Sequence, residues 1–122
     1  MVAAVGTASG FEWLPAARPL PDVGRALDLL VTAPLTEEAF FRAWLLRSAD
    51  RVGVPPAAGL AASALFFSLW HTPGGASEFF FFAALGLWLA LLYRKSDGSL
   101  PLVAGTHASF NLIVVLLRAV RA

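Results

Sequence analysis

The 122-residue chain contains no cysteine, and only 14% of its residues are charged, whereas about 25% is usual for a soluble domain. The missing cysteine excludes a disulfide scaffold and a zinc site built from thiolates. Nine basic and eight acidic residues leave a formal charge of only +1. Binding of nucleic acid, which depends on neutralising many phosphates, is therefore not expected.

Apolar residues take the place of the missing charges. They make up 58% of the chain, against about 45–50% in soluble domains, and the mean hydropathy is +0.72. The run FFFFAALGLWLALLY fills residues 79–93 without an ionisable group before its tyrosine. The surrounding stretch 75–94 supplies the roughly 20 residues that a helix needs to cross a bilayer. This composition and this run predict a membrane protein.

Two further apolar stretches, residues 55–71 and 100–117, are predicted to be membrane-spanning helices. The stretch 21–51 has a helical pattern that charged residues interrupt, and Pro34 is expected to kink or split it. No strand pattern competes with the helical ones. We therefore predict an all-α fold, a polytopic membrane bundle of about four transmembrane helices in up-and-down order.

Two adjacent carboxylates, Glu37 and Glu38, lie in the interrupted helix, although a charge inside a bilayer costs at least about 2.5–3.5 kcal/mol. Glu38 precedes Arg42 by four residues, so we expect an ion pair along one helical face. Glu37 has no such partner, and an unpaired carboxylate in a dry cavity holds a proton more tightly, as a general base at neutral pH must. The alternative is that Thr36 caps a helix whose first turn contains both acids.

Both histidines of the chain also fall in apolar segments. His71 ends the stretch 55–71, four residues after Phe67, while His107 and Asn111 are four residues apart and share one helical face. Taken singly, each has a structural explanation: His71 as an interfacial residue, and His107 with Asn111 as a hydrogen-bonding pair between helices. Together with the acid pair, they form a candidate active site.

Three motifs occur in order: EExxxR at residues 37–42, FxxxH at residues 67–71 and HxxxN at residues 107–111. This set resembles the CPBP family of intramembrane proteases, which includes the CAAX prenyl endopeptidases. The resemblance covers about residues 30–115 and implies an all-helical membrane fold and an intramembrane endopeptidase of the glutamic type. Family members are commonly larger, with further helices around the four that carry the motifs.

The resemblance also implies roles for the motif residues. Glu37 resembles the catalytic base, and His71 resembles the residue that helps to position and activate the attacking water. His107 and Asn111 resemble the pair that stabilises the oxyanion, whose donors commonly contribute about 2.7–4 kcal/mol each. The expected supporting residues are Glu38, Arg42 and Phe67.

This mechanism requires no cofactor, but a divalent metal such as zinc is the main alternative. Two histidines and a glutamate with one open position are a known catalytic zinc set, and here the ligands would be Glu37, His71 and His107. Against a metal, the sequence lacks HExxH, and no acid is evident that would orient either histidine. We therefore expect the metal-free mechanism.

Two other classes of function remain open. A non-catalytic membrane protein that binds and neutralises a partner, such as a bacteriocin-immunity factor, would use the bundle only as a scaffold. An ion or proton carrier would line its path with the same acids and histidines. For the protease, the expected partners are the lipid bilayer and a peptide or protein substrate with a membrane-proximal cleavage site.

Residues 1–122 are expected to form one domain, and residues 1–10 lack the basic start and long apolar stretch of a cleaved signal. The abundance of Ala, Arg and Leu favours a bacterial source, so we expect a multi-pass protein of the inner cell membrane. A sorting or maturation substrate fits that source better than a prenylated tail. Trp44, Trp70 and Trp88 are expected to anchor membrane interfaces or to fill helix contacts.

Overall fold

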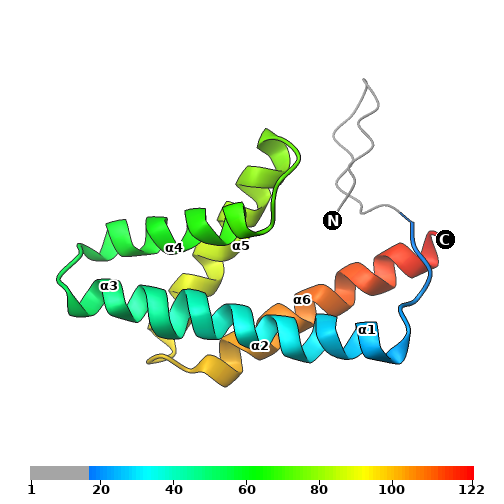
Figure 1. Ribbon diagram of the computed structural model, residues 1–122, viewed down its shortest axis with the longest axis horizontal. Helices are drawn as coiled ribbons and strands as arrows, with labels where there is room; N and C mark the ends of the chain where they lie inside the picture. Colours follow the sequence, from blue (N-terminus) through cyan, green and yellow to red (C-terminus); the bar gives the residue numbers. More distant parts are fainter. Residues whose placement is uncertain (1–16) are drawn as a thin grey trace.

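The computed structural model describes residues 17–122, and in that part of the chain every regular element is a helix (Figure 1). The helices form four rods, and successive rods run in opposite directions (Figure 1). The predicted all-α fold is therefore confirmed. Residues 1–10, for which no cleaved signal is expected, lie outside the described residues, as does the start of the predicted single domain.

The first rod is a continuous helical stretch in which α-helical and π-helical segments alternate. Asp22 caps its start by accepting a hydrogen bond from the Arg25 backbone amide at 2.8 Å. Its segments are α1 (Val23–Leu27), η1 (Asp28–Thr32), α2 (Ala33–Glu38), η2 (Ala39–Leu46) and α3 (Arg47–Arg51), of which the two η segments are π-helical.

Pro34 lies inside the first rod, near the start of α2, without dividing it. A proline cannot donate to the carbonyl four residues before it, and its ring clashes with that carbonyl, which here belongs to Leu30. The wider π-helical turn of η1 contains Leu30 and ends just before α2. The expected disturbance at Pro34 is therefore a change of helix type, without a break in the rod.

The other three rods match the predicted apolar stretches and are α4 (Pro56–Trp70), α5 (Ala76–Lys95) and α6 (Leu100–Val120). By length and composition, α5 with 20 residues and α6 with 21 can cross a membrane, whereas α4 has only 15. Of the most apolar window, 22% is buried in α5 and 11% in α6, although the core helix of a soluble protein is mostly buried. The exposed apolar surface fits a membrane protein, and the count of four spans stays a prediction.

Close packing of α4 on α5 fixes the centre of the bundle. Gly86 of α5 is buried, and a Cβ atom added to it would lie 2.9 Å from the Phe67 ring and 3.2 Å from the Ala64 Cα atom. The two helices approach this closely because glycine has no side chain. The last rod, α6, packs mainly along α2 and η1 and also contacts α5, while η2 of the first rod packs against α4.

Candidate active site

The two adjacent acids of α2 have different surroundings. The Glu38 side chain is fully buried, whereas the Glu37 side chain keeps 17% of its surface exposed. Consecutive residues of a helix point about 100° apart, which gives the two carboxylates different neighbours. Thr36 lies inside the helix and donates its hydroxyl to the Thr32 carbonyl oxygen at 2.7 Å. The alternative in which Thr36 caps the helix is therefore wrong.

Glu38 forms an ion pair with Arg42, as the four-residue spacing predicted. Glu38 Oε2 and Arg42 Nε lie 3.1 Å apart, and both side chains are completely buried. Arg42 Nη2 also donates to the Gly86 carbonyl oxygen at 3.1 Å, and its guanidinium carbon lies 4.8 Å from the centre of the Phe67 ring. Buried charges require partners of this kind. The arginine therefore ties the acid-bearing helix to both α4 and α5.

The other carboxylate oxygen of Glu38 holds His107 of α6. Glu38 Oε1 lies 2.8 Å from His107 Nδ1, and the imidazole is almost completely buried. An ionised carboxylate only accepts hydrogen bonds, so Nδ1 is the donor. His107 Nε2 lies on the other side of the ring, 3.8 Å from Glu37 Oε2. The expectation that no acid orients either histidine is therefore wrong for His107.

His71 follows the last residue of α4 and approaches Glu37 from a second helix. Its Nδ1 atom donates to the Phe67 carbonyl oxygen at 2.7 Å, since a carbonyl oxygen only accepts. Its Nε2 atom lies 3.6 Å from Glu37 Oε2. The backbone of Phe67, one turn earlier, thereby decides which nitrogen of His71 faces the acid.

The Nε2 atoms of both histidines therefore lie near the same oxygen of Glu37. This oxygen, Oε2, is buried and has no hydrogen-bond partner within residues 17–122. Each Nδ1 proton is already used elsewhere, so a neutral imidazole presents a lone pair at Nε2. Acceptors that meet in this way need a proton or a donor molecule between them. The arrangement can hold a water molecule or a mobile proton, as general acid–base chemistry requires.

Asn111, the fourth residue with a predicted catalytic role, lies one turn beyond His107 on α6. Its Nδ2 atom donates to the Leu29 carbonyl oxygen in η1 at 2.8 Å. That contact joins α6 to the π-helical part of the first rod. The structure therefore brings Glu37, His71 and His107 together and places Asn111 beside this cluster, against the backbone of η1.

Within residues 17–122, no group of three or more His, Cys, Asp or Glu side chains has the placement needed to hold a metal ion.

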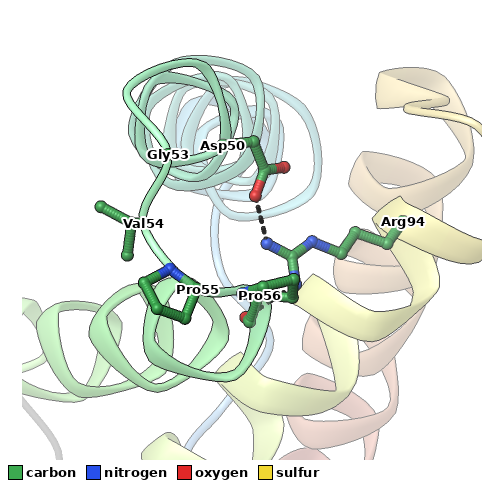
Figure 2. Close-up of a pocket in the computed structure, with 6 residues that line it drawn as sticks. All are labelled: Asp50, Gly53, Val54, Pro55, Pro56 and Arg94. Atoms are coloured by element: carbon green, nitrogen blue, oxygen red, sulfur yellow. Dashed lines mark hydrogen bonds and ion pairs between the residues drawn. The ribbon is translucent and has the colours of Figure 1, made fainter.

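An open hollow of about 550 Å³ lies at the end of the first rod, away from the acid–histidine cluster (Figure 2). Arg94 of α5 donates there to the Asp50 carboxylate and, at 2.8 Å, to the Pro56 carbonyl oxygen (Figure 2). These contacts tie the end of α5 to α3 and to the start of α4. The hollow is lined by Asp50, Gly53, Val54, Pro55, Pro56 and Arg94.

Three contacts of the cluster involve residues to which the sequence assigned no role in it. Gly86 contributes a carbonyl oxygen, which every residue type has, and Phe82 stacks on His71 from within a run of four phenylalanines. The Trp70 side chain, expected at an interface or a helix contact, lies next to the Glu37 carboxylate. Of these three residues, only Phe82 and Trp70 could have been suspected from the sequence, because aromatic residues near a histidine commonly pack against it.

Apolar helices around a buried acid and two imidazoles define an α-helical membrane protein with an acid–base site between its helices. The chain belongs to the type II CAAX prenyl endopeptidase Rce1-like family, whose family model matches residues 19–113. The matched range contains all three motifs and confirms the resemblance to the CAAX proteases. The protein is accordingly a membrane-embedded protease of the CAAX type. Comparisons with curated proteins and with solved structures give no match.

Proposed function

We propose that the protein is an endopeptidase that cleaves a peptide bond within the membrane by means of a water molecule activated by Glu37. The observation that carries this proposal is the position of Glu37 Oε2, 3.6 Å from His71 Nε2 and 3.8 Å from His107 Nε2. A water molecule at this point would find acceptors for both of its hydrogens and keep its lone pairs for the substrate.

In the proposed reaction, Glu37 takes one proton from the water while the water oxygen bonds to the carbonyl carbon of the scissile peptide. His71 Nε2 accepts the other hydrogen of the water and so orients it. The tetrahedral intermediate then breaks at its C–N bond, and the proton held by Glu37 passes to the leaving nitrogen. One water molecule is consumed, and an amine and a carboxylic acid are released.

His107 and Asn111 are proposed to stabilise the oxyanion of that intermediate. His107 is proposed to enter the reaction as the imidazolium, protonated from solvent before the water attacks, so that Nε2 donates to the oxyanion; the Glu38 carboxylate at 2.8 Å from Nδ1 offsets the added charge. Asn111 uses one amide hydrogen for the Leu29 carbonyl, so its second amide hydrogen is left for the substrate oxygen. Arg42 and Phe67 support the two helices that carry Glu38 and His71.

The reaction is proposed to need no metal, because Glu37 itself serves as the base that activates the water. Treatment with a chelator should therefore leave the cleavage rate unchanged. Activity that disappears with the chelator and returns with stoichiometric zinc would contradict this part of the proposal and favour the zinc-dependent form of the protease.

The proposed substrate is a membrane-anchored protein or a carboxy-terminal tail, and the proposed location is the inner membrane of a bacterium, with all four rods crossing the bilayer. The family supports a tail-cleaving activity. The apolar surfaces of α5 and α6 support a lipid environment on several sides of the site.

Reconstitution in lipid with candidate membrane-anchored tails tests the proposal by comparing wild type with Glu37→Gln. Glutamine has nearly the same shape but cannot take the proton, so cleavage should fall by at least about a hundredfold while the protein still folds. Glu78→Gln is the matched control, because Glu78 caps the Gly74 amide at 2.8 Å and should leave cleavage unchanged.

The same variant separates the other classes of function. Unchanged biological activity in Glu37→Gln would favour a non-catalytic binding protein. Proton or ion flux in sealed vesicles that His107→Ala abolishes, without any peptide cleavage by wild type, would favour a carrier.

A further inference from the structure

The imidazole of His71 lies between two phenylalanine rings. Its centre is 4.5 Å from that of Phe67, with the planes tilted by 48°, and 4.4 Å from that of Phe82, with the planes only 16° apart. The second geometry is a parallel stack, in which two flat faces cover each other. Phe67 belongs to α4, as does the turn before His71, whereas Phe82 comes from α5. The stack therefore joins the end of α4 to a second helix.

The position of His71 in the chain explains why the ring needs this support. His71 is the first residue beyond α4 and precedes Thr72, whose φ of +46° ends the helical conformation. His71 therefore has helical neighbours only on its N-terminal side. The bond from Nδ1 to the Phe67 carbonyl oxygen fixes one edge of the ring but does not fix the tilt of its plane. A parallel ring on one face restricts that tilt.

We infer that Phe82 is a positioning residue for His71: its ring sets the plane of the imidazole, so that Nε2 is aimed at Glu37 Oε2. The inference rests on the proposed function, in which His71 orients the attacking water. Phe82 acts only through His71, because its contact is with the face of the imidazole and not with the nitrogen that faces Glu37.

The run of phenylalanines that contains Phe82 also provides a matched control. Phe80 is 68% exposed, and its ring contact is with its neighbour Phe79 at 5.5 Å. Phe81 lies against Phe110 of α6 at 5.9 Å. A leucine in place of Phe80 therefore makes the same chemical change on the same helix without removing the stack on His71.

The test measures kcat and KM for the full chain in lipid, with the variants Phe82→Leu, Phe82→Tyr and Phe80→Leu. Loss of the stack should lower kcat of Phe82→Leu between about tenfold and a hundredfold, as expected when a catalytic group is misplaced by a fraction of an ångström to one ångström. KM should change by less than about twofold, because substrate binding is not affected. Phe82→Tyr keeps the ring and should restore kcat, and Phe80→Leu should match wild type.

A second measurement does not depend on cleavage. The chain has two histidines, so ¹⁵N-histidine labelling gives two sets of ring signals, and the His107→Gln variant identifies those of His71. In wild type and Phe82→Tyr, the signals should show a single tautomer with the proton on Nδ1. In Phe82→Leu they should shift toward an average of both tautomers, because a ring that tilts loses the bond to the Phe67 carbonyl.

The outcomes distinguish this inference from the proposed function. If wild type cleaves no substrate but Phe82→Leu changes the His71 signals, the proposed function fails and the positioning role stands. If wild type cleaves and Phe82→Leu keeps both its kcat and its ring signals, the positioning role is overturned. Should Phe82→Leu fail to fold, Phe82→Met, which fills the space with a flexible apolar chain, replaces it, with the same two outcomes.

Discussion

Glu38 Oε1 accepts a hydrogen bond from His107 Nδ1 at 2.8 Å, and this contact gives two consecutive acids different tasks. Glu38 uses one oxygen for His107 and the other for Arg42, so its carboxylate is occupied on both sides. Glu37 keeps a buried oxygen that faces two ring nitrogens. Glu38 therefore supports the structure of the site, and Glu37 is available for the proposed proton transfer.

Glu38→Gln should weaken both the fold and the reaction. Removal of one partner from a buried ion pair leaves the other charge unpaired, which lowers the free energy of unfolding by about 3–5 kcal/mol. The new amide can also donate to His107 Nδ1, which favours the tautomer with the proton on Nε2. Thermal unfolding in detergent and kcat in lipid measure the two effects. A variant with wild-type stability and kcat would contradict the role assigned to Glu38.

Gly86→Ala should lower stability because the new methyl group would lie 2.9 Å from the Phe67 ring and 3.2 Å from the Ala64 backbone. Overpacking of this kind lowers the free energy of unfolding by about 1–3 kcal/mol. Gly105→Ala in α6 is the control, because its Cβ meets nothing within 4 Å. That change should be neutral or should stabilise the helix by up to about 1 kcal/mol. Equal melting temperatures for the two variants would argue against the close contact of α4 and α5.

Asn111→Ala should lower kcat without raising KM, because an oxyanion donor acts on the transition state and not on the bound substrate. The expected loss is about 10²- to 10³-fold, the usual effect of removing one such donor. Ser109→Ala is the control, since the Ser109 hydroxyl bonds only within its helix, to the Gly105 carbonyl at 2.8 Å. A lower melting temperature with unchanged kcat would assign Asn111 to the contact with Leu29 alone.

Variants at the hollow of Figure 2 should affect stability and leave cleavage unchanged (Figure 2). The Asp50 and Arg94 side chains are 45% and 23% exposed, so their ion pair contributes at most about 1 kcal/mol. A double-mutant cycle with Asp50→Asn and Arg94→Met measures that coupling, and Lys95→Met is the neighbouring control. A tenfold loss of kcat in either single variant would show that this end of the bundle takes part in the reaction.

The helices and the cluster could largely be predicted because each depends on short-range patterns. The lengths of the apolar stretches predicted the bounds of α5 and α6 to within a few residues. The four-residue spacing from Glu38 to Arg42 correctly predicted their ion pair. The ordered motifs pointed to Glu37, His71 and His107, which come from three different rods and lie together.

The contacts between rods could not be predicted, because helical periodicity tells which residues share a face but not which face of a neighbour they meet. Glu38 and His107 are 69 positions apart, and Arg42 meets the backbone of Gly86, which has no side chain to signal a polar contact. The π-helical turns around α2 were missed for a different reason. Proline rules predict a disturbance at Pro34 without specifying that the helix widens there.

The short length of α4 bears on how water, the second reactant of hydrolysis, reaches a site that is embedded in lipid. At 1.5 Å per residue, its 15 residues extend about 22 Å, whereas the hydrocarbon layer is about 30 Å thick. Since α4 starts beside the charged end of the first rod, near Arg51, the shortfall comes at the end that carries His71. If the rods cross a bilayer as proposed, headgroup hydration has to reach inward at that point or the lipid has to thin. Either response brings bulk solvent to the depth of Glu37.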